Sequence, residues 1–186
     1  MIHNVECNFK LREKEFQDLM EIYLRRVYSY TRIEIFREVY VAGSVADFVV
    51  FSPYNNGFIR IYELKMYWDK DYKRLKRQIK DYLQVGDVVT VATFGGTPDI
   101  ELPKEVNIMN VKILNGWLDY TYVTKSSEGK IGYGVSNKPE NIDLKKRLML
   151  MQSLRRDWER KRFYADKVCG KIQRKIIRLE NKKLFK

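Results

Sequence analysis

Hydrophobic residues in the first half of the chain recur with two different spacings, which predict helices and strands. Apolar residues three and four positions apart predict amphipathic helices over Phe9–Tyr28 and from Asp69 or Asp71 to about Leu83. Short runs rich in β-branched and aromatic residues predict four strands, at Arg32–Val41, Ala46–Phe51, Phe58–Met66 and Val88–Phe94. The predicted order is therefore a helix, three strands, a helix and a strand.

The residues after Phe94 divide into an additional β segment and a helical tail. Val106–Leu114 predicts another strand, and Trp117–Thr124 with Gly129–Val135 predicts a hairpin. Residues 136–139 have the composition of a loop, whereas residues 141–186 are helical in composition and contain no proline. We expect an α/β domain over residues 1–136 and a basic helical extension over residues 137–186.

Two carboxylates and a lysine fall on the central predicted hairpin. Asn56-Gly57 between two apolar runs is a strong hairpin signal, so the strand with Asp47 should run antiparallel to the strand with Glu63 and Lys65. Side chains two residues apart on a strand share a face, which places Glu63 beside Lys65. The hairpin can bring Asp47 across from Glu63.

This combination of residues suits the hydrolysis of a phosphodiester bond, which needs an activated water and neutralised phosphate charge. Mg²⁺ can supply both, and it prefers one or two carboxylates together with waters and phosphate oxygens. Asp47, Glu63 and the main-chain carbonyl of Leu64 are candidate ligands. Lys65 is a candidate for orienting or deprotonating the attacking water, or for steadying the phosphate. The alternative is an ordinary cross-strand cluster of charged residues on a surface hairpin.

The second predicted helix adds a polar pair, Gln78 and Tyr82, which lie four residues apart and hence on adjacent turns. The order Asp, Glu-x-Lys and Gln-x-x-x-Tyr resembles the PD-(D/E)xK nuclease superfamily, and within it the RecB-like branch with a Gln-x-x-x-Tyr helix. Glu38 and Arg74-Leu75 also resemble positions in small bacterial and phage members. The resemblance extends over roughly residues 16–94, with Ala46 where the superfamily's name has a proline.

The resemblance implies a restriction-endonuclease-like core and a deoxyribonuclease that uses Mg²⁺ or Mn²⁺, encoded by a phage or a mobile element. It implies that the catalytic residues are Asp47, Glu63, Lys65, Gln78 and Tyr82. Glu38 would be an additional carboxylate at the metal. For Glu38, an ion pair with Arg37 or Lys65 is the alternative explanation.

The charge of the chain points to a polyanionic partner. Its 186 residues include 36 Lys and Arg against 24 Asp and Glu, which gives a net charge of +12. Lysines and arginines bound to phosphates release counterions, so this balance favours DNA as a partner. We expect no membrane span, because no run of 18 apolar residues occurs. The only two cysteines, Cys7 and Cys169, lie far apart, and reduced thiols in a cytoplasmic protein are expected.

Nearly all the excess charge belongs to the tail, where 16 Lys and Arg stand against 5 Asp and Glu from residue 141 onward. The tail could fold back and line a DNA channel, form a homo-oligomer or bind a protein partner through its apolar stripe, or act as a basic amphipathic helix. Nucleic-acid contacts are predicted for basic residues of the second helix and the tail, namely Arg74, Arg77, Arg155, Arg156, Arg160, Lys161, Arg162, Lys171, Arg174 and Lys175.

Two hypotheses for the function follow. The first is a metal-dependent nuclease that cleaves DNA. The second is a catalytically silent nucleic-acid-binding or assembly protein that has kept a nuclease fold.

Overall fold

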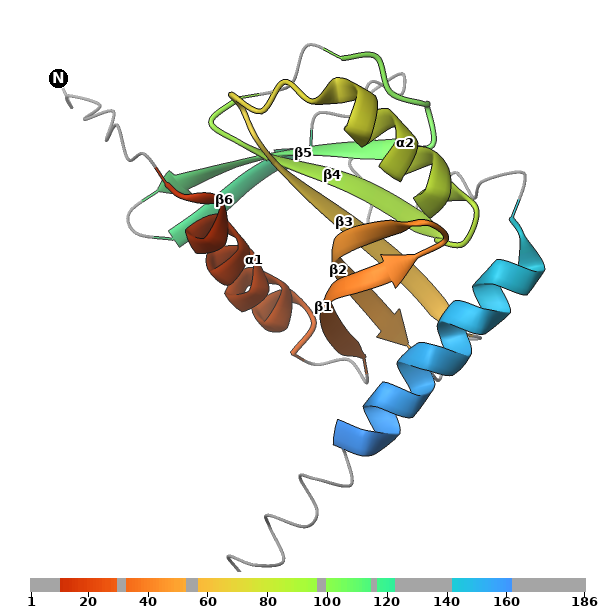
Figure 1. The fold of residues 1–186 in the computed structure, drawn as a ribbon. Coiled ribbons are helices and arrows are strands. Elements are labelled where there is room, and N and C mark those ends of the chain that lie inside the picture. The colour runs from red at the N-terminus through yellow and green to blue at the C-terminus, as the bar shows by residue number, and fades with distance from the viewer. Residues whose placement is uncertain are drawn as a thin grey trace, which may run out of the picture.

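The computed structural model describes residues 11–29, 33–52, 57–96, 100–114, 117–122 and 142–161. Within these ranges the chain forms a six-stranded mixed β-sheet and three helices (Figure 1). The predicted α/β class is therefore confirmed. None of the helices in the described ranges is long and apolar enough to cross a membrane.

The elements follow the predicted order. The helices are α1 (Glu13–Val27), α2 (Tyr72–Leu83) and a third helix over residues 144–161, drawn in blue in Figure 1. The strands are β1 (Glu34–Val41), β2 (Ser44–Ser52), β3 (Phe58–Met66), β4 (Val88–Phe94), β5 (Val106–Leu114) and β6 (Trp117–Tyr122). The second arm of the predicted hairpin, Gly129–Val135, lies outside the described residues, as does the predicted domain boundary.

The six strands lie in the sheet in their sequence order, β1 to β6. The pairs β1–β2, β2–β3 and β5–β6 are antiparallel, as short connections require. The pairs β3–β4 and β4–β5 are parallel. The first parallel pair is possible because α2 carries the chain back across one face of the sheet.

Each face of the sheet has its own hydrophobic core, because alternate residues of a strand point to opposite faces. Ile59 and Ile61 of β3 pack in the core that includes the buried face of α2. Leu64, on the same strand, packs with Phe16 and Met20 of α1 in the core of the other face. The sheet therefore lies between α1 and α2.

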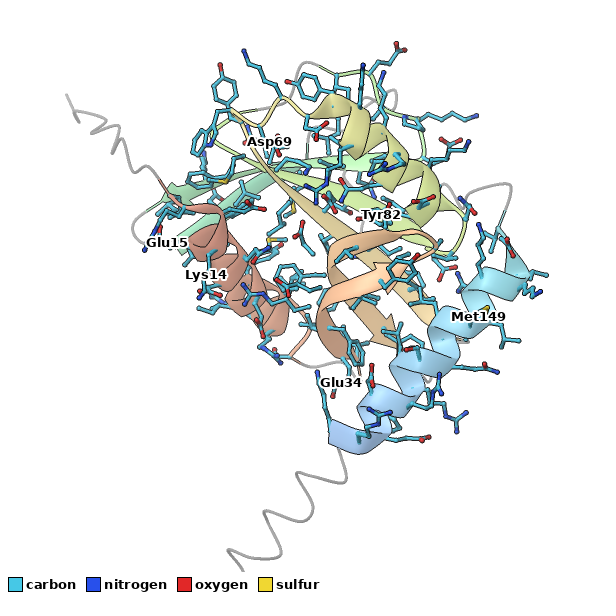
Figure 2. All side chains as sticks on the ribbon, in the orientation of Figure 1. Lys14, Glu15, Glu34, Asp69, Tyr82 and Met149 are labelled. Atoms are coloured by element: carbon cyan, nitrogen blue, oxygen red, sulfur yellow. The ribbon has the colours of Figure 1, made fainter. Side chains whose placement is uncertain are left out.

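The third helix adds to the core on the α2 side. Leu150 and Leu154 are buried in that core, and Trp158 packs against it. Leu148 and Met149 of this helix are exposed, and Met149 is labelled in Figure 2. Residues 144–161 are therefore folded back onto the domain, as the first interpretation of the tail expected, and the DNA channel stays a prediction.

A buried ion pair anchors this helix. The Arg147 guanidinium lies 2.7 Å from the Asp87 carboxylate, and it also donates to the carbonyl oxygens of Val85 (2.7 Å) and Gly57 (3.1 Å). Asp87 in turn accepts a hydrogen bond from the main-chain N–H of Ile59. One arginine thus joins the third helix to the beginning of β3 and to the loop before β4.

Replacing Arg147 with alanine should lower the free energy of unfolding by about 3–5 kcal/mol, because it leaves the Asp87 carboxylate buried without its counter-charge. Arg155→Ala is the matched control: Arg155 pairs with Glu159 at the surface of the same helix, and its loss should cost less than about 1 kcal/mol. Urea unfolding of the three proteins measures both effects. Equal stabilities for the two variants would contradict the anchoring role of Arg147.

Candidate functional site

The candidate site lies where β2 and β3 separate. The ladder between these strands runs from the Ser52–Phe58 pair to the Phe48–Tyr62 pair and ends there, whereas β3 continues beside β4. Beyond that point the main-chain N–H of Leu64 donates instead to a carboxylate oxygen of Asp47, at 2.7 Å. The Asp47 side chain therefore takes the place of a strand carbonyl and fills the fork between the strands.

Helix α1 holds the other oxygen of the Asp47 carboxylate. Gln17 of α1 donates to it at 3.1 Å, and the same amide accepts a hydrogen bond of 2.8 Å from Arg37 of β1. Burial raises the pKa of Asp47 above its ordinary value, against the lowering effect of the hydrogen bonds from Leu64 and Gln17. The carboxylate is thus fixed in orientation by groups from three elements.

Glu63 of β3 is the more deeply buried of the two acids, with 2% of its surface exposed. One of its oxygens lies 2.7 Å from the Tyr82 hydroxyl, and the other lies 3.2 Å from the Lys65 ammonium group. Burial first, and the nearby negative charge of Asp47 second, raise the pKa of Glu63 to about 7. Glu63 therefore holds a proton for much of the time at neutral pH when no cation is present.

The hydrogen bonds of Tyr82 agree with a protonated Glu63. The Tyr82 oxygen lies 2.7 Å from Glu63 and 2.6 Å from the carbonyl oxygen of Val45, and a phenol has only one hydrogen to give. A protonated Glu63 can donate to Tyr82 while Tyr82 donates to Val45. Burial and the Glu63 carboxylate also raise the pKa of Tyr82, so the phenol stays neutral.

Gln78 completes this polar group. It lies one turn before Tyr82 on α2, and both side chains belong to the buried face of the helix; Tyr82 is labelled in Figure 2. Its amide nitrogen donates to the Tyr82 oxygen at 3.2 Å and to the Val45 carbonyl at 3.3 Å. Its amide oxygen is buried and finds no donor among the described residues. The helical spacing of four predicted this pairing of Gln78 and Tyr82, and the structure confirms it.

The Lys65 ammonium group lies between two carboxylates, 3.2 Å from Glu63 and 3.4 Å from Asp69. Asp69 comes from the turn after β3, and the sequence suggested it only as a possible beginning of the second helix, where an acid can cap the first turn. Asp71 is the residue that caps α2, because its side chain accepts from the N–H of Arg74 at 3.1 Å. Asp69 is thereby free to contact Lys65.

Glu38 has an unusual backbone at a position that the register places opposite Asp47. Its φ is +53°, and it falls between the Arg37–Phe48 and Val39–Ala46 pairs of the β1–β2 ladder. A non-glycine residue in this conformation costs of order 1–2 kcal/mol. The salt bridges of Arg37 and Lys65 go to other carboxylates, so neither expected ion pair with Glu38 is formed.

Two of the proposed metal ligands thus lie together, and two stay predictions. Asp47 and Glu63 are close enough for the charge of one to raise the pKa of the other. Glu38 is exposed, and within the described ranges no three acidic, histidine or cysteine side chains converge as a closed metal site. The main-chain N–H of Leu64 donates a hydrogen bond to Asp47. A role for the Leu64 carbonyl oxygen as a metal ligand stays a prediction.

Those residues predicted to contact nucleic acid that the structure describes lie on two different helices, and only one of these helices carries residues of the candidate site. Arg74 and Arg77 are exposed on α2, which carries Gln78 and Tyr82. Arg155, Arg156, Arg160 and Lys161 are exposed on the third helix, which contacts the beginning of β3 rather than the end with Glu63 and Lys65. The remaining predicted contacts lie outside the described residues, namely Arg162, Lys171, Arg174 and Lys175.

Comparisons with known proteins bear only on the fold. No protein-family model matches the chain, and no curated protein matches it. A solved structure of a protein of unknown function from Silicibacter pomeroyi superposes with a TM-score of 0.50, covering 82% of this chain and 90% of that one. The two sequences are 18% identical, so the likeness extends to the architecture alone.

Protonation of Glu63 predicts how stability changes with pH. Its pKa is 4.5 in a model peptide and about 7 in the fold, so the contribution of neutral Glu63 is fully present below pH 4.5 and is lost as the pH rises to 7. The loss should be about 3 kcal/mol relative to Glu63→Gln, which keeps the neutral form at every pH. Urea unfolding from pH 4.5 to 7.5 in EDTA measures it. Parallel curves for the two proteins would contradict the raised pKa.

Proposed function

We propose that this protein is a nuclease that hydrolyses phosphodiester bonds of DNA with the help of a divalent cation. The observation that carries the proposal is the fork between β2 and β3, where Asp47 accepts from the Leu64 N–H, its charge acts on Glu63, and Lys65 lies 3.2 Å from Glu63. Buried acids are expensive unless they are paired, protonated or bound to a cation. Two of them at one break in a sheet therefore point to a site for positive charge.

The residues present suit Mg²⁺ or Mn²⁺. Each carboxylate oxygen of Asp47 and Glu63 accepts one hydrogen bond or ion pair and keeps a further lone pair for a cation. The buried amide oxygen of Gln78, which has no donor among the described residues, is an acceptor for a cation-bound water. Bound between the two acids, the cation would neutralise phosphate charge and lower the pKa of a water molecule.

The side chains around the acids have separate tasks in this proposal. Lys65 places its ammonium group beside Glu63, where it can orient the attacking water or stabilise the negative charge that develops on the phosphate. Tyr82 and Gln17 hold Glu63 and Asp47 by hydrogen bonds and so act as positioning residues. Gln78 holds Tyr82 in turn.

The fold supports the same proposal. The order α1, three antiparallel strands, α2 and a parallel strand β4 is compatible with the restriction-endonuclease-like core implied by the resemblance. The positions of the proposed catalytic residues also support it, with Asp47 on β2, Glu63 and Lys65 on β3, and Gln78 and Tyr82 on α2.

Cleavage of linear, circular and single-stranded DNA tests the activity. With Mg²⁺ or Mn²⁺ we expect products that disappear in EDTA and fall at least about a hundredfold in Asp47→Asn and in Lys65→Ala, because each loses a group that stabilises the transition state. Glu159→Gln, which removes an exposed carboxylate on the third helix, is the control and should retain full activity. Absence of products from every substrate, with DNA binding intact, would instead favour a catalytically silent binding protein.

Cation binding has a readout that does not depend on cleavage. If Asp47 and Glu63 bind Mn²⁺, millimolar Mn²⁺ should raise the melting temperature of the wild-type protein, because a ligand that binds only the folded state stabilises it. At a concentration a hundred times the dissociation constant the gain is about 2.7 kcal/mol. The Glu63→Gln and Asp47→Asn proteins should show no rise. A rise of equal size in all three proteins would place the cation elsewhere.

A further inference from the structure

Two aromatic side chains lie at the tip of the turn that follows β3. Asp69 N–H donates to the carbonyl oxygen of Met66 at 2.9 Å, so Tyr67 and Trp68 occupy the two central positions of a β-turn. Glycine, proline, asparagine, aspartate and serine dominate such positions. The exposed fractions of the residues Tyr67 and Trp68 are 57% and 53%, so neither residue is part of the buried core.

This turn is held rigidly and is joined directly to the candidate site. The N–H of Tyr67 donates to the carbonyl oxygen of Phe94 on β4, and the Asp69 carboxylate contacts the Lys65 ammonium group (Figure 2 labels Asp69). One face of the Tyr67 ring lies on Gly96, where an added Cβ would come within 2.7 Å of the ring. The backbone of the turn and the Tyr67 ring are therefore held by contacts within the domain.

The surface beside the turn is strongly basic. Six exposed lysines and arginines lie between residues 70 and 80, namely Lys70, Lys73, Arg74, Lys76, Arg77 and Lys80. The acids of the same stretch are engaged within the protein: Asp69 contacts Lys65, Asp71 caps α2, and Asp81 accepts a hydrogen bond from Ser44. The six basic side chains outnumber these three acids, so the net charge of this surface is positive and suits a chain of phosphates.

We propose that the 66–69 turn is a stacking platform for the unpaired bases of single-stranded DNA, a substrate class that deepens the proposed nuclease function and rests on it. Bases stack on exposed aromatic rings only when their own faces are free, as they are in a single strand. A strand stacked on Trp68 and Tyr67 has its phosphates beside the basic side chains of α2. Because the turn directly follows the end of β3 that carries Glu63 and Lys65, the adjoining phosphodiester can reach the candidate site.

Binding of a fluorescent oligothymidine in EDTA, followed by anisotropy at several salt concentrations, tests the platform without cleavage. Trp68→Leu should weaken the affinity at least about fivefold, and Trp68→Phe should keep most of it, because phenylalanine retains an aromatic face and leucine retains only apolar bulk. A blunt duplex of equal length is the matched ligand, and its affinity should be the same for all three proteins.

The outcomes separate this inference from the proposed function. Equal oligothymidine affinities for the Leu, Phe and wild-type proteins would overturn the stacking platform, whether or not the protein cleaves DNA. Equal losses of affinity for the duplex and for the single strand in Trp68→Leu would also overturn it. A general loss of structure or of charge contacts would then explain the weaker binding. If binding of the single strand depends on the aromatic ring but no cleavage occurs in Mg²⁺ or Mn²⁺, the stacking platform is supported and the proposed nuclease activity is contradicted.

Discussion

The hydrogen bond from the Leu64 main chain to the Asp47 carboxylate is the contact on which the rest of the site depends. It occurs where the β2–β3 ladder ends, and it satisfies a buried N–H that would otherwise lose its strand partner. Because the two strands separate there, β3 can present Glu63 and Lys65 to α2 while Asp47 turns to α1. The same opening in the sheet thus makes room for polar groups in an otherwise apolar core.

Electrostatics then limits what this opening can contain. Two acids in a buried position repel each other, and the protein reduces that cost with a proton on Glu63, the Lys65 ammonium group and hydrogen bonds from Gln17 and Tyr82. None of these groups neutralises both carboxylates. The site therefore keeps an electrostatic cost, which the proposed binding of a divalent cation would reduce.

The sequence predicted those features that depend on local pattern. The runs that predicted β1 to β5, the antiparallel pairing of β2 with β3 and the spacing of Gln78 and Tyr82 depend on neighbours in the chain, and the structure confirms them. Gln17 was missed because its role depends on how α1 docks on the sheet, which its helical spacing does not encode. Asp69 was missed because an acid before a helix equally suits a cap, and only the turn geometry assigns it to Lys65.

The Arg147 anchor has a consequence for how the domain is made. Its contacts with Asp87 and Gly57 join residues 60 and 90 positions apart in the chain, so the core beneath α2 stays incomplete until the third helix is available. Contacts over such separations slow folding, since the intervening loop must close first. During synthesis on the ribosome, the strands of the sheet therefore emerge before the third helix, which covers part of the core on the α2 side. The nascent domain has an open hydrophobic surface until the helix with Leu150 and Leu154 docks.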